Sequence, residues 1–328
     1  MMTQEIATLV GLVALPFTIL AADSSEFLAR QLEAAKDAET CLYRLRDSRG
    51  QGMDCLKVFQ GVGSPAGVYW GVYHHRINGV FSVHLAESND LRQWSHLVAL
   101  DEHASQATVW PCEGGGLLLA YEKDAPNSCW IRLRYYDGFA QLRRGEHARE
   151  IDISRTLAPT AEGTPSIESV ELGPTGVDGS TIEMRFHFFQ NANVDQLAIG
   201  SLADFKTWKS EASAKINTDL RERGWLGNLG DRDKFVWRDQ VFYLQEIQRR
   251  KGDWSSWRLG LCDGDGILIR ALSIQTHRGS TAFANPSATW VVDSNGERKL
   301  VITTFLLSEG SARGEAGSLL YVIDPSKG

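Results

Sequence analysis

The sequence predicts an all-β protein with one short helix near its N-terminus. Beyond residue 50, runs rich in Val, Ile, Tyr, Phe and Trp alternate with Gly, Asn and Asp, the pattern of short strands joined by turns. The 31 Gly residues suit such turns, and the 10 Trp residues suit a large β core or a surface that stacks on sugars. With 43% hydrophobic and 23% charged residues, the composition excludes a disordered or coiled-coil chain.

Two repeated patterns divide the β region into equal units. The pattern D-L-x-x-W in residues 88–94 returns in modified form in residues 201–208, and Asp90 and Asp204 lie 114 positions apart, or two units of 57. A strand that begins apolar and ends in aromatic and polar residues occurs five times, in residues 68–75, 117–123, 182–190, 241–246 and 300–307. One four-stranded unit per copy predicts a five-bladed β-propeller over residues 51–328. The first strand of each blade is expected near residues 55–60, 107–112, 165–172, 233–237 and 286–292.

The N-terminal segment is interpreted as a signal peptide over residues 1–22. The apolar run of residues 6–21 has the length of a signal-peptide core, and Ala21 and Ala22 suit cleavage. Pro16 and the shortness of the run make a membrane anchor the weaker alternative, beside a plain buried helix. The mature protein is therefore expected to be secreted, extracellular and free of the membrane.

Residues 23–50 are expected to form a helix and a loop. Asp23 to Glu26 resembles a capping box, and apolar residues follow at helical spacing until about Thr40. Cys41 and Cys55 flank the loop and are the best disulfide candidates in a secreted chain. The net charge of −7 without basic runs argues against nucleic-acid binding, and the absence of C-x-x-C argues against a structural zinc site.

The D-L-x-x-W turn and the sequence Glu162-Gly163-Thr164-Pro165 before the third blade carry a family resemblance. Over roughly residues 50–328 the chain resembles the five-bladed propeller glycosidases, the superfamily of glycoside hydrolase family 43, with the exact family left open. In that superfamily a Glu at the start of the third blade is the general acid, which implies this role for Glu162. A two-carboxylate inverting mechanism also needs a base, for which Asp54 and Asp231 at other blade starts are the candidates.

In a propeller the first strands of all blades start near one mouth of the central channel. The other candidate site residues are expected near this mouth. Gln106 stands where the superfamily often has an Asp, and its amide can bind a sugar hydroxyl but cannot titrate. The further candidates for substrate binding are His74, Glu122, Trp225, Arg232, Glu246 and Asn285. No cofactor is predicted, and the sequence leaves open whether the channel holds a structural calcium ion.

The leading function is a secreted, monomeric glycoside hydrolase that cleaves a poly- or oligosaccharide. A non-catalytic carbohydrate-binding propeller is the alternative that Gln106 favours. A polysaccharide lyase on the same architecture is a third hypothesis, with Tyr73, His74 and Arg232 as its candidate residues. His74 and His75 are adjacent on a strand and should face opposite sides of its sheet.

Overall fold

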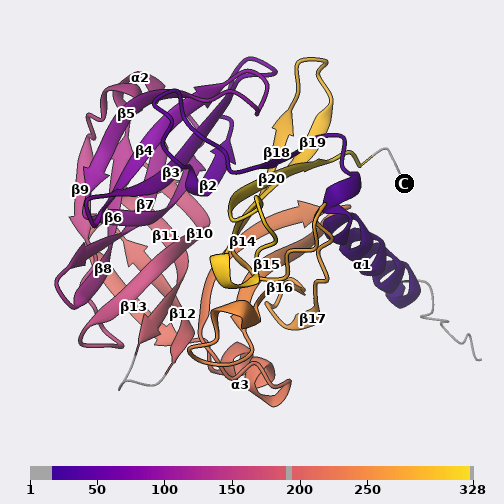
Figure 1. Ribbon diagram of the computed structural model, residues 1–328. Coiled ribbons are helices and arrows are strands. Elements are labelled where there is room, and N and C mark those ends of the chain that lie inside the picture. The colour runs from indigo at the N-terminus through magenta and orange to yellow at the C-terminus, as the bar shows by residue number, and fades with distance from the viewer. Residues whose placement is uncertain (1–16, 190–193, 326–328) are drawn as a thin grey trace, which may run out of the picture.

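The computed structural model describes residues 17–189 and 194–325 and shows a mostly β protein (Figure 1). Its strands form antiparallel groups of four, each built mainly from consecutive strands. Three groups are separate sheets, and two are joined into an eight-stranded sheet by the single parallel bridge between Ala161 and Cys129. This gives five groups in all, which we number in chain order.

The bounds of the strands follow the chain in these groups. Group one contains β2 (Asp54–Phe59), β3 (Tyr69–Ile77), β4 (Val80–Ser88) and β5 (Ser95–Glu102), and group two contains β6 (Ala104–Pro111), β7 (Leu117–Ala125), β8 (Ser128–Tyr136) and β9 (Arg149–Asp152). Group three contains β10 (Ala161–Gly173), β11 (Gly176–Phe189), β12 (Asp195–Ala203) and β13 (Thr207–Ala212), and group four contains β14 (Leu229–Trp237), β15 (Gln240–Gln248), β16 (Trp257–Cys262) and β17 (Leu268–Ala271). Group five contains β18 (Phe283–Val292), β19 (Arg298–Leu306), β20 (Gly317–Ile323) and, at its edge, β1 (Cys41–Tyr43).

Each predicted first strand overlaps the observed first strand of one group, and each predicted second strand overlaps the second strand of that group. The predicted positions of these strands are therefore confirmed. The repeated tryptophan motif forms the turn between the third and fourth strands of groups one and three, which explains its spacing of two units. In the first copy, Asp90 Oδ1 accepts the backbone N–H groups of Arg92 and Gln93 at 2.8 Å each. The indole of Trp94 donates to the Leu91 carbonyl at 3.0 Å, which fixes the turn against the sheet.

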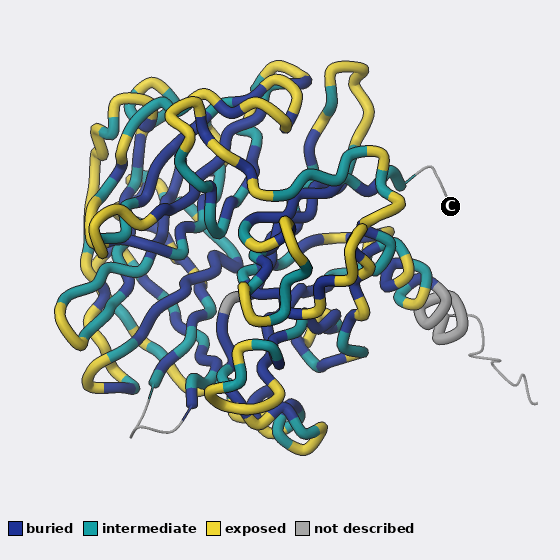
Figure 2. The backbone as a smooth tube through the Cα atoms, viewed as in Figure 1, coloured by how far each residue is buried: buried dark blue, intermediate teal, exposed yellow. Residues whose placement is uncertain are grey.

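Neighbouring groups pack face to face through separate apolar clusters. Each cluster joins a different pair: groups one and two, two and three, three and four, four and five, and finally five and one. The groups therefore follow one another in a circle that is held by side-chain packing. Figure 2 shows buried segments along the strands and exposed segments mainly at the turns.

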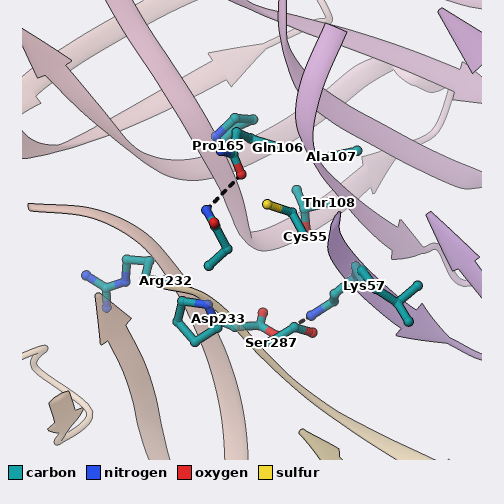
Figure 3. Close-up of a pocket in the computed structure, with 12 residues that line it drawn as sticks. Cys55, Lys57, Gln106, Ala107, Thr108, Pro165, Arg232, Asp233 and Ser287 are labelled. Atoms are coloured by element: carbon teal, nitrogen blue, oxygen red, sulfur yellow. Dashed lines mark hydrogen bonds and ion pairs between the residues drawn. The ribbon is translucent and has the colours of Figure 1, made fainter. Parts of the chain in front are cut away.

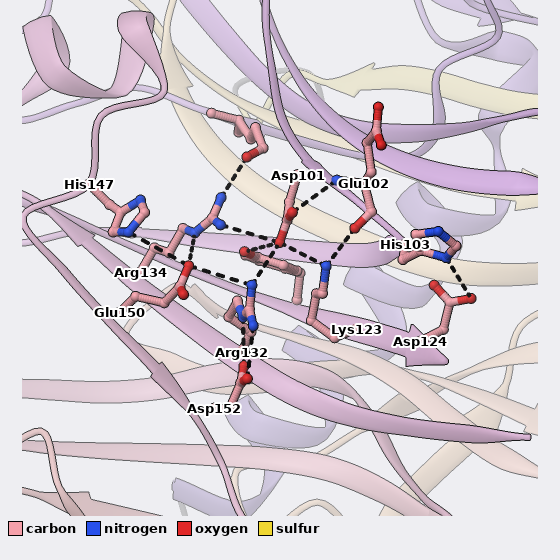
Figure 4. A network of polar contacts seen from close by, with 12 residues as sticks. Asp101, Glu102, His103, Lys123, Asp124, Arg132, Arg134, His147, Glu150 and Asp152 are labelled. Carbon is pink, nitrogen blue, oxygen red and sulfur yellow. Dashed lines mark hydrogen bonds and ion pairs between the residues drawn. The ribbon is translucent and has the colours of Figure 1, made fainter. Parts of the chain in front are cut away.

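A polar cluster reinforces the contact between groups one and two (Figure 4). Asp101 at the end of β5 accepts the Tyr121 hydroxyl at 2.8 Å and lies 3.2 Å from Lys123 Nζ. Its carboxylate also lies 3.3 Å from Arg132 and 3.4 Å from Arg134. One carboxylate thus gathers three cations of the next group, which keeps their charges partnered in a half-buried seam.

The N-terminal segment differs from the expectation for residues 23–50. Helix α1 (Phe17–Glu33) begins before the capping-box-like sequence and is followed by the short helix η1 (Ala35–Asp37). Leu28 and Leu32 of α1 are fully buried against groups four and five. The Tyr321 hydroxyl donates to the Leu32 carbonyl at 2.8 Å. Strand β1 pairs with β20, so the β architecture begins before residue 51.

The predicted signal peptide falls largely outside the described residues. Residues 1–16 lie outside them, and residues 17–22 belong to α1, so the signal peptide stays a prediction. No helix within the described ranges combines the length and apolar character needed to cross a membrane. The remaining helices are α2 (Phe139–Arg144), α3 (Ala214–Glu222), η2 (Trp254–Ser256) and η3 (Ser308–Gly310).

The expected disulfide between Cys41 and Cys55 is not formed, and none of the five cysteines, all within the described ranges, is disulfide-bonded. Cys41 lies in β1 opposite Tyr321 of group five, whereas Cys55 lies in the first strand of group one. Proximity in sequence was misleading because the chain between them crosses from one group to the next.

Candidate functional site

The first strands of all five groups carry a bulge near their start. The pairing register shifts in each between two residues: Asp54 and Lys57, Ser105 and Thr108, Gly163 and Ser166, Leu229 and Arg232, and Ala284 and Ser287. Within four of these bulges one residue has a left-handed backbone, with φ of 51° at Cys55, 53° at Gln106, 43° at Thr164 and 48° at Asn285. Such a conformation is unfavourable for a β-branched residue, so Thr164 needs strong support from its surroundings.

These bulges surround a small central cavity (Figure 3). Residues from all five first strands line it, but its volume of about 20 Å³ holds little more than one water molecule. The Asn285 amide donates to Gln106 Oε1 at 2.9 Å across it, and Lys57 forms an ion pair with Asp233. A sugar ring is therefore too large for this cavity.

The second strands hold these bulges through side chains near their ends. His74 Nδ1 accepts the backbone N–H of Gln106 at 3.1 Å, and Glu122 Oε2 accepts that of Thr164 at 3.1 Å. Glu246 Oε2 accepts the N–H of Asn285 at 2.7 Å. In each case the acceptor belongs to one group and the donor to the bulge of the next. We call His74, Glu122 and Glu246 the latch residues; all three were predicted as substrate contacts.

Glu162, the acid expected from sequence, is buried, with 1% of its surface exposed. Its Oε1 accepts three backbone N–H groups, from Thr156 at 2.8 Å, Leu157 at 2.6 Å and Ala158 at 3.0 Å. Its Oε2 is buried without a hydrogen-bond partner among the described residues. The carboxyl thus fixes the connection between β9 and β10, directly before the third bulge.

Three other carboxyls have raised pKa values: Asp54 at the start of group one, and Glu122 and Asp195 near the third bulge. Burial raises the pKa of Asp54, at the start of β2, to about 6, against the opposing charge of Arg46. Burial also raises the pKa of Glu122, to which the charge of Asp195 adds, while His187 and the N–H of Thr164 oppose the shift. The pKa of Asp195 is itself raised by burial.

Asp195 and His187 were not found from sequence. His187 ends β11 opposite Gly163, and its Nδ1 contacts the Thr164 hydroxyl; Asp195 begins β12 opposite Phe189. The signal that could have located them is their place at the turn between second and third strands. That turn lies at the same end of a group as the start of the first strand.

Arg232 and Asp231 lie at the fourth bulge, as expected, but Arg232 is a buried residue. Its guanidinium lies 3.8 Å from the centre of the Tyr243 ring and 3.8 Å from Glu168 Oε1, and burial lowers its pKa. Glu168 also accepts the Tyr243 hydroxyl at 2.8 Å. Arg232 therefore reaches the central cavity from a packed seam, while the side chain of Asp231 lies outside the described part of the structure.

Trp225 is a core residue instead of an open sugar platform. It is 5% exposed in the cluster between groups three and four, with Arg249 stacked 4.5 Å from its ring. The loop position suggested exposure, but α3 and β14 cover the ring.

The residues named for lyase chemistry are also buried. The Tyr73 hydroxyl donates to Asp47 at 2.6 Å, and His74 faces the second group as a latch residue, so neither is presented to a polysaccharide. Among the residues that the structure describes, no three His, Cys, Asp or Glu side chains gather in a way that could hold a metal ion.

Comparison with known proteins gives a structural likeness without a sequence match. No family model and no curated protein matches the sequence. A thermostable family-43 glycoside hydrolase shares 11% identity at a TM-score of 0.55, covering 86% of this chain and 92% of its own. A putative glycosidase from Bacteroides thetaiotaomicron shares 11% identity at 0.52, covering 91% of this chain and 95% of its own.

A family 117 glycoside hydrolase from Zobellia galactanivorans shares 13% identity at a TM-score of 0.51, covering 89% of this chain and 91% of its own. At these identities the likeness concerns the fold. The fold of this chain is therefore that of family-43 and related propeller glycosidases, as the resemblance in sequence implied.

Proposed function

We propose that this protein is a five-bladed β-propeller glycosidase, in which each strand group is one blade. The support is the circle of five packed interfaces and the equivalent bulge at the start of every first strand. Its substrate is a poly- or oligosaccharide bound at the mouth of the channel, since the central cavity is too small for a sugar ring. Secretion and a monomeric state remain part of this proposal.

The observation that carries the enzymatic proposal is the raised pKa of carboxyls that lie beside the first-strand starts of groups one and three. An inverting glycosidase needs a protonated carboxyl for the leaving oxygen and a carboxylate that activates water. Glu122 suits the acid, because burial and Asp195 favour its protonated form. Asp54 suits the base, because a pKa of about 6 leaves it ionised but basic at neutral pH.

Glu162 is then a positioning residue, which differs from the role that the family resemblance implies. Its Oε1 is used by three backbone donors and its surface is covered, whereas Glu122 and Asp54 are partly exposed. Glu162 precedes Thr164 by two residues, and the backbone N–H of Thr164 donates to Glu122. It thereby fixes the orientation of the proposed acid.

The test compares two latch carboxylates that have equivalent places in different groups. Glu122→Gln should lower kcat on an unactivated glycoside about 10²–10⁴-fold, the usual share of general acid catalysis. Glu246→Gln keeps the latch to Asn285 and should leave kcat within about threefold, since Glu246 has no chemical step in this proposal. Equal losses in both variants would contradict the assignment of the acid. NMR of the initial product tests inversion at the anomeric carbon.

A non-catalytic carbohydrate-binding propeller is the second candidate. It is favoured by Gln106, which stands where the family resemblance implies an Asp and whose amide oxygen accepts a hydrogen bond from Asn285 in the lining of the cavity. If the wild-type protein binds oligosaccharides but cleaves none of a broad glycan panel, this function replaces hydrolysis.

A further inference from the structure

A surface pocket of about 520 Å³ lies at the outer side of group two. It is formed by the start of β8, the end of β9 and the connection to β10, with Trp130, Asp152 and Arg155 among its walls. The same connection supplies the three N–H groups that bind Glu162, and Ala158 belongs both to it and to the pocket. The pocket thus adjoins the segment that fixes the proposed active site.

The two charged residues of the pocket differ in how they are neutralised. Asp152 accepts two hydrogen bonds from Arg132, at 2.6 and 2.8 Å, so its charge is already paired (Figure 4). Arg155 donates from Nη1 to Ser128 Oγ at 2.8 Å and to the Cys129 carbonyl at 3.2 Å. These are neutral acceptors, and no carboxylate among the described residues forms an ion pair with Arg155. Of the two charged residues in the lining, Arg155 is therefore the one without an ion pair among the described residues.

The bonds of Arg155 also orient it. Because Nη1 is held by two acceptors, the guanidinium is fixed while its remaining N–H groups are left for a ligand. A planar guanidinium binds carboxylate and sulfate oxygens in pairs, and the indole of Trp130 offers an apolar wall for the C–H face of a sugar ring. This combination suits a sugar that bears a negative charge better than a neutral one.

We propose that this pocket is a subsite for an anionic sugar residue, a uronate or a sulfated sugar, with Arg155 as its charge-selecting residue and Trp130 as its stacking wall. As a part of the substrate site it rests on the proposed glycosidase function, but binding itself does not. The start of β8, which lines the pocket, follows the turn between the second and third strands of group two, and this turn lies at the same end of the group as the start of its first strand. The subsite would therefore hold a sugar at the same end of the protein as the proposed acid.

Calorimetry on the full chain tests the subsite with matched probes. Trimers of galacturonate, glucuronate and mannuronate are each compared with their methyl esters, and sulfated galactose trimers with their desulfated forms. The wild type should bind at least one charged trimer about tenfold more tightly than its neutral counterpart. Arg155→Gln should abolish that difference, and Trp130→Ala should weaken both members of the pair. As a control, Arg149→Gln removes an exposed cation of β9 that is paired with Asp178 of β11. It should change neither the affinity for these trimers nor the preference for the charged one.

The outcomes separate this proposal from the proposed function. If no charged trimer binds more tightly than its neutral form, or if Arg155→Gln keeps the preference, the subsite is wrong even if the enzyme cleaves neutral glycans. If the preference is present and depends on Arg155 while no glycan is cleaved, the subsite holds and the hydrolase proposal fails. Thermal unfolding of each variant identifies any that is misfolded, and Arg155→Lys, which keeps the charge without the planar fork, then serves as the second variant.

Discussion

Replacing Glu162 separates a catalytic acid from a residue that holds a loop. Glu162→Gln keeps an oxygen acceptor but removes the charge that strengthens the three bonds to residues 156–158. Bonds to charged groups contribute about 1.5–3 kcal/mol each and neutral ones about 0.5–1.5, and the three share one oxygen. We therefore expect Glu162→Gln to lower the free energy of unfolding by about 1–3 kcal/mol. Glu162→Ala removes the acceptor altogether and should lower it by about 3–5 kcal/mol.

Urea unfolding and steady-state kinetics on the same preparations measure both effects. A positioning role predicts that stability decreases in the order wild type, Gln, Ala, with kcat of the Gln variant reduced less than about tenfold. A catalytic acid would give a loss of about 10²–10⁴ in kcat for Glu162→Gln with unchanged stability. The second result would refute the reasoning and restore the role that the family resemblance implies.

Three further predictions follow from the carboxyls, histidines and glycines of the first four groups. With Asp54 as base, kcat/KM should fall as the pH falls through about 6, and Asp54→Asn should remove the activity. The pKa of Asp54 is raised in the folded protein, so its contribution to stability is present in full below about pH 4 and is lost as the pH rises through 6. At pH 8 the free energy of unfolding of Asp54→Asn should therefore exceed that of the wild type by about 2–3 kcal/mol. Burial lowers the pKa of His84 to about 3, and the charges of His75, Arg49 and His96 add to this shift, so stability is lost as the pH falls from 6.5 towards 3. His84→Phe should therefore reduce the loss of stability between pH 7 and 5 by about 2 kcal/mol. A Cβ at Gly163 would lie 1.8 Å from Glu122 Oε2 and one at Gly230 would lie 2.0 Å from Glu246 Oε1, so both Ala variants should lose stability in thermal unfolding, but only Gly163→Ala should also lose kcat.

The strand order was predictable because its signal is local and repeated. The recurring apolar strand marks each group, and the D-L-x-x-W turn marks groups one and three, without any knowledge of distant contacts. Strand β1 was missed because three residues carry no pattern of their own, and only pairing with β20, almost 280 positions later, makes Cys41–Tyr43 a strand. The start of α1 at Phe17 was missed because a capping sequence is a weak signal beside an apolar run.

The strand starts that carry several candidate residues were predictable, but the contacts of those residues were not. Strand starts identified Asp54, Gln106 and Asn285, and the structure gathers residues of all these bulges around one cavity. That Gln106 and Asn285 bind each other depends on distances across the circle, which no local pattern contains. Burial of Trp225 likewise depends on neighbours from other elements of the chain.

The latch residues show how a repeated scaffold can acquire one reactive position. His74, Glu122 and Glu246 occupy equivalent places and accept the same kind of backbone N–H from the next group. What distinguishes Glu122 is its surroundings: Asp195 adds a negative charge, and Thr164, held in a strained conformation, contacts His187. Because the geometry of the latch is shared, a difference in kinetics between the Glu122 and Glu246 variants tests whether Glu122 has a chemical role beyond holding the bulge. In this fold the repeat supplies the position of the carboxyl, and in the proposed function burial and the neighbouring Asp195 favour the protonated form of Glu122.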